Sequence, residues 1–196
     1  MAPAAEQQQV ILEVAAAFDK VGVPYAVGGS VASSLFGIPR FTQDADFTAE
    51  PFPGLESQFA ACFEPDYYLS VPSMVQANRA RSTFNIIHIP SGFKVDVFVR
   101  KDRPFEKSAM ARRQSLALAE RPIVLVTPED IVLFKLEWYR LGEESSDRQW
   151  SDIRGVLQVR AGQLDEAYLD RWADELGVRD LLELARREAR PIGTDG

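Results

Sequence analysis

The stretch Val27-Gly-Gly-Ser-Val-Ala-Ser-Ser-Leu-Phe-Gly-Ile-Pro-Arg-Phe-Thr-Gln-Asp-Ala-Asp-Phe47 decides the fold, because it contains three short signals in a fixed order. A glycine pair and a serine follow an apolar run, an Arg-x-Thr comes next, and two aspartates one residue apart complete the stretch. Each signal alone is common in turns and on surfaces. Their order indicates a ligand site.

The hydrophobic pattern along the chain predicts strands and helices in alternation first, and helices alone afterwards. The predicted strands are residues 24–27, 45–48, 67–69, 83–89, 93–99 and 123–126. The predicted helices are residues 6–21, 30–36, 55–63, 74–79, 127–141, 149–160, 164–176 and 178–190, and residues 100–113 are expected to be basic and irregular. We therefore expect an α/β (α+β) core with a mixed β-sheet over residues 1–126, followed by a helical part over residues 127–196.

Two aspartates, Asp44 and Asp46, lie at the beginning of the predicted strand 45–48. Side chains two residues apart in a strand point to the same side of the sheet. Neighbouring carboxylates repel each other, and a cation between them removes this cost. Oxygen ligands of this kind suit Mg²⁺ or Mn²⁺, so we expect the pair to bind such an ion. The alternative is that both are solvated loop acids.

A third carboxylate, Asp96, lies in the apolar strand 93–99. The alternation predicts that Asp96 points with Lys94 and Phe98 to one side of the sheet, opposite the valines of the strand. If this strand is a neighbour of strand 45–48, the three aspartates form a cup for one or two divalent ions. The alternative is that Asp96 only marks a polar face of the sheet.

Gly28 and Gly29 lie between a predicted strand and a predicted helix. Glycine permits close approach of the backbone to a ligand, and the N–H groups at a helix start favour an anion. The Ser30 hydroxyl can add a hydrogen bond, and Arg40 and Thr42 can orient the loop or contact the substrate. The spacing matches neither a Walker A loop nor a Rossmann fingerprint. Because this glycine–serine segment lies beside the aspartate pair, we interpret it as a nucleoside triphosphate site. The alternative for the glycines is an ordinary turn between strand and helix. The alternative for Arg40 is an ion pair with a nearby acid.

The composition narrows the function classes. The 196 residues are 46% hydrophobic, which is enough for a packed core, and the net charge of −7 argues against a dedicated, sequence-specific DNA-binding protein. A single cysteine, Cys62, excludes an internal disulfide, and we expect it to be a small buried hydrophobe. Because His88 is the single histidine of the sequence, we do not expect a histidine-based metal site or a Ser-His-Asp triad. We expect no signal peptide and no membrane span, and a cytoplasmic location.

Taken in order, the motifs resemble the polymerase-beta-like nucleotidyltransferase superfamily: Gly28-Gly29-Ser30, then Arg40-x-Thr42-x-Asp44-x-Asp46, then Asp96 in an apolar strand. The Arg-x-Thr-x-Asp-x-Asp form is most similar to the AbiEii-type abortive-infection nucleotidyltransferase toxins and related small bacterial nucleotidyltransferase-like domains. The resemblance covers about residues 8–158.

The resemblance implies roles for five residues. Asp44 and Asp46 would bind metal, and Asp96 would be the third ligand or the base that activates the acceptor hydroxyl. Lys135 would contact the triphosphate, and Asp152 would position Lys135 or the acceptor. The sequence supports one part of this, because Lys135 lies in an apolar helix, where an ammonium group seeks an anion. A surface lysine whose stem packs on the helix is the alternative.

The function implied is a metal-dependent nucleotidyltransferase that moves a nucleoside monophosphate from an NTP to an acceptor and releases pyrophosphate. The acceptor would be RNA such as tRNA, or a protein, and the enzyme could be the toxin of a toxin–antitoxin or phage-defence system with an antitoxin partner. Local basic stretches, at residues 79–81 and 100–113, are candidate RNA contacts or simply solvated faces. Two alternatives stay open: a small-molecule (antibiotic) adenylyltransferase, and a non-catalytic nucleotide-binding or partner-binding module of the same fold.

Overall fold

The computed structural model describes residues 3–189, which form two compact units. The first unit, which we call the α/β unit, consists of the described residues 3–28 and 41–125. The second, the helical unit, consists of residues 29–40 and 126–189. The chain therefore passes between the units three times.

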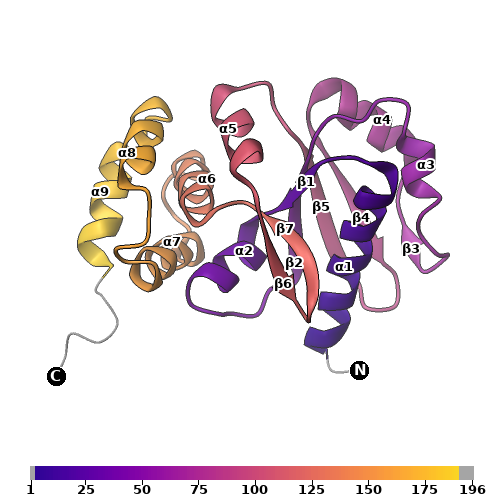
Figure 1. The fold of residues 1–196 in the computed structure, drawn as a ribbon, viewed down its shortest axis with the longest axis horizontal. Helices are drawn as coiled ribbons and strands as arrows, with labels where there is room; N and C mark the ends of the chain where they lie inside the picture. Colours follow the sequence, from indigo (N-terminus) through magenta and orange to yellow (C-terminus); the bar gives the residue numbers. More distant parts are fainter. Residues whose placement is uncertain (1–2, 190–196) are drawn as a thin grey trace. The chain divides into compact units, whose positions relative to one another are not determined.

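The α/β unit is built on one mixed sheet, which has seven strands in the described residues, in the spatial order β3-β4-β5-β2-β1-β7-β6 (Figure 1). The strands are β1 Tyr25–Val27, β2 Asp44–Ala49, β3 Tyr67–Tyr68, β4 Thr83–His88, β5 Phe93–Val99, β6 Gln114–Leu118 and β7 Arg121–Leu125. β2 pairs with β5 in parallel, as β1 does with β7, and the other neighbouring strands are antiparallel. The predicted mixed-sheet α/β class is confirmed.

One face of this sheet packs against helices of the same unit, α1 Pro3–Val21, α3 Glu56–Ala60 and α4 Val71–Ala80. Phe18 of α1 lies 5.5 Å from Tyr25 and 4.5 Å from Phe59 between ring centroids, and Phe47 of β2 lies 6.1 Å from it. Each such side chain stabilises the fold by about 1.5–3 kcal/mol when buried. Because a strand alternates its side chains, burial of Phe47 and Val97 fixes which residues of β2 and β5 face the other side.

Residues 100–113, expected to be irregular, contain the helix α5 Pro104–Arg112. Pro104 fits the first turn, where its missing N–H costs nothing. Phe105, Ala109 and Met110 are buried, and this spacing is helical. The prediction was wrong because the three apolar positions are few and are flanked by the charged residues of the stretch, which hide the apolar stripe.

Strand β6 was also not predicted. Most of its side chains are exposed, so it lacks the alternation that signals a strand, and it forms because its backbone pairs with β7 at the edge of the sheet. The turn between them uses Ala119 and Glu120, with φ of 48° and 65°. Hairpin turns of this kind usually contain Gly or Asn, so the sequence gives no sign of one here.

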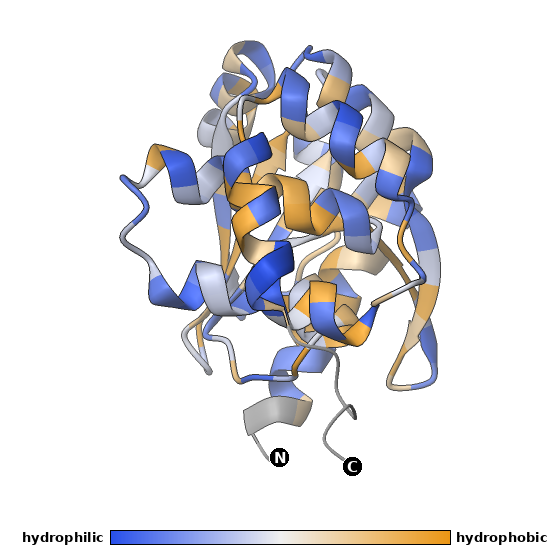
Figure 2. Ribbon diagram, turned by 90° about the vertical axis from the view of Figure 1, so that its left-hand side faces the viewer, coloured by the Kyte–Doolittle hydropathy of each residue, from blue (hydrophilic) through white to orange (hydrophobic). Residues whose placement is uncertain are grey.

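The helical unit contains α2 Gly29–Phe36, α6 Pro128–Leu141, α7 Asp147–Val159, α8 Glu166–Glu175 and α9 Arg179–Glu188. Thr127 caps α6 as predicted, since its Oγ1 accepts from the Asp130 N–H at 3.2 Å. Hydrophobic and hydrophilic residues alternate along these helices, as Figure 2 shows, and the hydrophobic ones form the core of the unit. Among residues 3–189 no helix combines the length and the apolar composition that crossing a membrane requires.

Helix α2 belongs to the helical unit, although the sequence assigned residues 29–40 to the α/β core. Its buried face packs against α6 and α7. At Gly37 the chain approaches α7 so closely that a Cβ atom would lie 2.7 Å from the Val156 nitrogen. Arg160 reinforces the contact by donating from Nε to the Phe36 carbonyl at 3.1 Å. The expected boundary, after residue 126, lies one residue from the last passage of the chain between the units, at Leu125–Val126.

Cys62 lies in the turn after α3 and is half-buried, so the expectation of a buried hydrophobe was wrong. Its Sγ donates to the Gln58 carbonyl at 3.4 Å.

Candidate active site

The three predicted carboxylates lie on one side of the α/β unit's sheet, on adjacent strands. In the parallel register of β2 and β5, Asp46 is opposite Asp96, and Asp44 is opposite Lys94. All four side chains are half-buried and alternate with fully buried residues of the core. We call Asp44, Asp46, Asp96 and Lys94 the acidic face.

Both carboxylate oxygens of Asp96 have partners. Lys94 Nζ lies 2.8 Å from Oδ2, and Asn85 Nδ2 of β4 donates to Oδ1. The hydrogen bond with Asp96 raises the pKa of Lys94, and the charges of Asp96, Asp44 and Asp46 add to this increase. Lys94 is therefore a permanent cation among the carboxylates at neutral pH.

The fit of the acidic face to a divalent metal is partial. Carboxylate oxygens are the donors that Mg²⁺ or Mn²⁺ takes, and the Lys94 ammonium shows that a cation is stable at this place. Yet in the part of the chain that the structure describes, no three His, Cys, Asp or Glu side chains are arranged to hold one ion. The three-aspartate site stays a prediction, and it requires Asp96 to exchange Lys94 for the metal.

Hydrogen bonds from Thr42 and Gly28 hold the aspartate pair in position. Thr42 Oγ1 donates to Asp44, 2.9 Å from Oδ1 and 3.1 Å from the main-chain carbonyl. The Gly28 N–H donates to the Asp46 carbonyl at 2.8 Å, at the end of β1. Thr42 and Gly28 thus shape the acidic face in this structure, while their predicted contact with a nucleotide stays a prediction.

The helical unit has its own charged cluster, centred on Asp152 of α7. Arg40 Nε lies 2.7 Å from Asp152 Oδ1, and Arg40 Nη2 donates to Oδ2 at 2.8 Å. Lys135 Nζ of α6 lies 2.9 Å from the same Oδ2. Burial alone would raise the pKa of Asp152, but the Arg40 hydrogen bonds and the Lys135 charge outweigh it and hold the pKa below its usual range. We call Arg40, Lys135 and Asp152 the buried cluster.

Further hydrogen bonds connect the buried cluster to α2 and α7. Arg40 Nη2 donates to Ser30 Oγ at 2.5 Å, in the first turn of α2, and Lys135 Nζ donates to Gln149 Oε1 at 2.9 Å. The Lys135 side chain is only 6% exposed, which excludes the surface-lysine alternative. Gly29, at the start of α2, has a φ of +52°, which glycine adopts without strain.

The predicted site residues therefore fall into two groups, one in each unit. Gly28, Thr42 and the three aspartates lie in the α/β unit; Gly29, Ser30 and the buried cluster lie in the helical unit. The sequence reasoning gave no role to Lys94, Asn85 or Gln149. Lys94 had a detectable signal, because it lies two residues before Asp96 on the same side of the strand.

The comparisons with known proteins agree with this fold. No protein-family model matches the sequence, and no curated protein sequence matches it. The structure is similar to that of an antigenic nucleotidyltransferase-like protein from Paracoccidioides brasiliensis, with a TM-score of 0.57, 19% identity, and coverage of 95% of this chain and 94% of that chain. The fold is nucleotidyltransferase-like.

Two structures of the antibiotic-resistance factor ANT(2'')-Ia are also similar. Its solution structure matches with a TM-score of 0.54 and 13% identity, over 95% of this chain and 99% of that chain. Its crystal structure with adenylyl-2''-tobramycin matches with a TM-score of 0.53 and 16% identity, over 89% and 99%. At these identities the likeness shows the nucleotidyltransferase-like fold, and the chemistry has to be argued from the residues.

Three of the six basic residues at 100–113 pair with acids of the α/β unit. Arg100 Nε lies 2.6 Å from Glu50, Lys107 Nζ lies 2.7 Å from Asp102, and Arg103 pairs with Glu106. This pairing favours the solvated-face interpretation of the stretch over a phosphate-binding surface.

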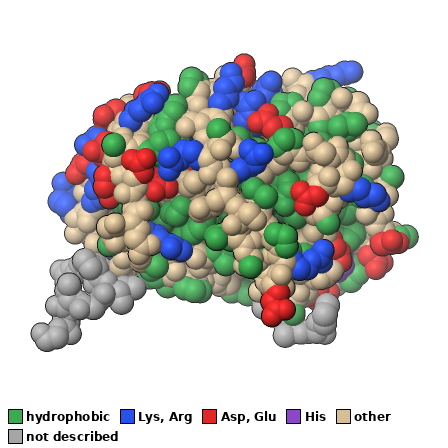
Figure 3. All heavy atoms as spheres, viewed as in Figure 1, with side chains coloured by type: hydrophobic (Ala, Val, Ile, Leu, Met, Phe, Trp, Pro, Cys, Tyr) green, Lys and Arg blue, Asp and Glu red, His purple; other side chains and the backbone are tan. Residues whose placement is uncertain are grey.

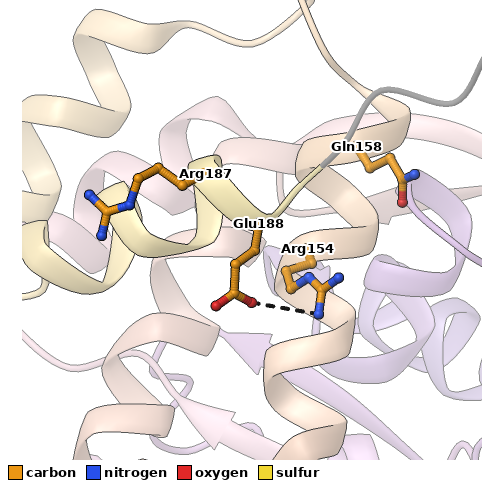
Figure 4. A pocket seen from close by; sticks show the side chains of 4 residues that line it. All are labelled: Arg154, Gln158, Arg187 and Glu188. Atoms are coloured by element: carbon orange, nitrogen blue, oxygen red, sulfur yellow. Dashed lines mark ion pairs between the residues drawn. The ribbon is translucent and has the colours of Figure 1, made fainter. Parts of the chain in front are cut away.

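The surface of the helical unit is similarly mixed in charge. Figure 3 shows Lys or Arg and Asp or Glu side chains interleaved over α8 and α9, where Arg186 contacts Glu166, Asp170 and Glu183. A pocket in this unit is lined by Arg154 and Gln158 of α7 and Arg187 and Glu188 of α9 (Figure 4). Arg154 lies 3.6 Å from Glu188 within it, and none of the predicted site residues line it.

Proposed function

We propose that the protein is a nucleotidyltransferase that transfers a nucleoside monophosphate from an NTP to an acceptor and releases pyrophosphate. One observation carries the proposal: in a nucleotidyltransferase-like fold, adjacent parallel strands bring Asp44, Asp46 and Asp96 to one side of the sheet. A polar row of this kind on two central strands has no role in packing the core, which lies on the opposite face.

Mg²⁺ or Mn²⁺ is the cofactor in this proposal. Asp44 and Asp46 would hold it, and Asp96 would either join them after releasing Lys94 or accept the proton of the attacking hydroxyl. When bound, such an ion neutralises phosphate charge and polarises the attacking oxygen. Thr42 prepares the site beforehand, since its hydroxyl fixes the orientation of the Asp44 carboxylate.

Within the helical unit, the proposal assigns phosphate binding to Lys135 and Arg40 of the buried cluster. Lys135 and Arg40 are both held by Asp152, so their positive groups are fixed in place without a ligand. Charged groups that need no rearrangement stabilise a developing negative charge most effectively. The N–H groups of Gly29 and Ser30, at the start of α2, would add hydrogen bonds to the anion.

For the acceptor, we place a cationic small molecule ahead of RNA. The net charge of −7 disfavours a polyanion, and three basic residues of the stretch 100–113 already pair with acids. The similar fold of ANT(2'')-Ia, solved with adenylyl-2''-tobramycin, supports the same choice. An RNA or protein acceptor, with a toxin role and an antitoxin partner in the cytoplasm, rests on the AbiEii-type motif and is the second candidate.

The test uses the four NTPs labelled in the α-phosphate, with Mg²⁺, against an aminoglycoside panel, bulk tRNA and a protein extract. We expect label transfer to one acceptor class, together with pyrophosphate release. Asp44→Asn combined with Asp46→Asn keeps the side-chain shape and should reduce transfer by at least about a hundredfold. Asp102→Asn, which removes an exposed acid of the same unit, should leave transfer unchanged.

Two outcomes oppose the proposal. Transfer that survives the double substitution would show that the acidic face is not the catalytic centre. NTP binding without transfer or pyrophosphate release would select the non-catalytic binding module instead.

A further inference from the structure

The acidic face contains its own cation. Lys94 Nζ lies 2.8 Å from Asp96 Oδ2, and the negative charges of Asp44 and Asp46 attract it as well. In the strand register Lys94 lies opposite Asp44 and two residues before Asp96. Its side chain therefore starts on the same side of the sheet as the carboxylates and next to them. No distant element has to move to deliver this positive charge.

The two partners of this ion pair differ in their freedom to move. The Lys94 side chain is 45% exposed, whereas the Asp96 side chain is only 17% exposed. Asp96 is also held by Asn85, and its strand is paired on both sides, with β2 and with β4. When the pair separates, Lys94 moves into water and Asp96 stays, because a long exposed lysine loses little on leaving such a pair.

We propose that Lys94 is a built-in counter-ion that competes with the divalent metal for Asp96 and so sets the metal affinity of the acidic face. The inference rests on the proposed function, since it takes Asp44 and Asp46 as metal ligands. One carboxylate oxygen does not contact an ammonium group and a metal ion equally well at once, and the two cations repel each other at this range. Lys94 neutralises the carboxylates before the metal arrives and leaves Asp96 when it binds.

This role differs in one measurement from that of an ion pair remote from the metal ligands. Removal of a remote pair lowers stability and leaves metal binding almost unchanged. Removal of a competitor also lowers stability without metal, because three carboxylates are left to repel one another, but it makes metal binding tighter.

The experiment titrates the full-length protein with Mn²⁺ alone and follows the free ion by electron paramagnetic resonance. Lys94→Met, which keeps the apolar stem in the strand, should bind Mn²⁺ about three- to tenfold more tightly than the wild type. Lys94→Arg keeps the charge and should bind no more tightly than the wild type. Lys107→Met removes a lysine from the exposed pair with Asp102 and should change the affinity by less than about twofold.

A second readout is the melting temperature in EDTA and in excess Mn²⁺. Lys94→Met should melt below the wild type in EDTA and gain more from Mn²⁺. The triple variant Asp44→Asn, Asp46→Asn, Lys94→Met should lose the gain in affinity, which ties the effect to the acidic face.

The outcomes separate the inference from the proposed function. If the wild type binds Mn²⁺ through Asp44 and Asp46 but Lys94→Met binds it no better, the counter-ion role is wrong and the proposed function stands. If neither protein binds Mn²⁺, both are overturned. Tight binding by Lys94→Met alone would support the competition for Asp96 but would count against the proposed function, because the wild type would then bind no metal.

Discussion

The two charged groups of the molecule, the acidic face and the buried cluster, satisfy their charges in different ways. In the buried cluster, Asp152 is shared by Arg40 and Lys135, and its side chain is 5% exposed. The acidic face has three half-buried aspartates and one half-exposed lysine. A deeply buried charge needs a partner at all times, whereas a partly exposed one exchanges partners at low cost. The difference indicates a rigid cationic scaffold in one unit and an exchangeable ligand site in the other.

Removal of Asp152 gives the largest expected effect. Asp152→Ala leaves the buried Lys135 and the half-buried Arg40 without their shared carboxylate, and we expect a loss of about 3–5 kcal/mol in the free energy of unfolding. Urea denaturation measures this loss. The control is Glu175→Ala, which breaks an exposed i,i+4 pair with Arg171 and should cost about 0.3–0.5 kcal/mol. Equal losses in the two variants would show that the buried cluster is no scaffold.

The buried cluster should contribute to the pH dependence of stability at the acid end. Because the folded-state pKa of Asp152 is lowered, its stabilising contribution is complete above the ordinary aspartate pKa of about 3.9 and is lost as the pH falls through the folded value. One such group contributes a slope of up to about 1.4 kcal/mol per pH unit in that window. Aspartate side chains titrate between roughly pH 2 and 5. Because the amide of Asp152→Asn does not titrate, the unfolding free energy of this variant, measured in urea over that range, should change less steeply with pH. Parallel slopes would contradict the lowered pKa.

Neutralising the acidic face gives the smallest expected effect, and its sign is reversed. Asp44→Asn keeps an acceptor oxygen for Thr42 and removes one repelling charge, so we expect a stability equal to or up to about 1 kcal/mol above that of the wild type. The gain should shrink in 1 M salt, where charges are screened beyond about 3 Å. Melting curves at low and high salt measure it. A clear loss of stability would mean that the acidic face is as structural as the buried cluster.

The sequence predicted those parts of the fold and of the site that depend on local alternation. The apolar positions of residues 93–99 fix the face of the strand on which Asp96 lies, and the same argument places Asp44 and Asp46 together. A period of two leaves no other arrangement once one face is buried. Asp44 and Asp46 were therefore predicted to share a side, and Asp96 was predicted to join them if the two strands were neighbours, which β2 and β5 are.

Features that depend on tertiary contacts were not predictable in the same way. Strand β6 exists because β7 offers it a pairing edge, and α2 joins the helical unit because Gly37 allows close contact with α7. The ion pair between Arg40 and Asp152 connects residues 112 positions apart in the chain, so no local pattern reveals it. Lys94 was placed correctly on its face, but its contact with Asp96 depends on side-chain geometry.

The most direct test of the account is anomalous diffraction from crystals soaked with Mn²⁺ and a non-hydrolysable NTP. The account predicts manganese bonded to the carboxylates of Asp44 and Asp46, with the phosphates of the nucleotide on the metal and Lys94 displaced from Asp96. Nucleotide bound elsewhere, or bound while Lys94 keeps its contact with Asp96 and no manganese lies on the acidic face, would contradict it.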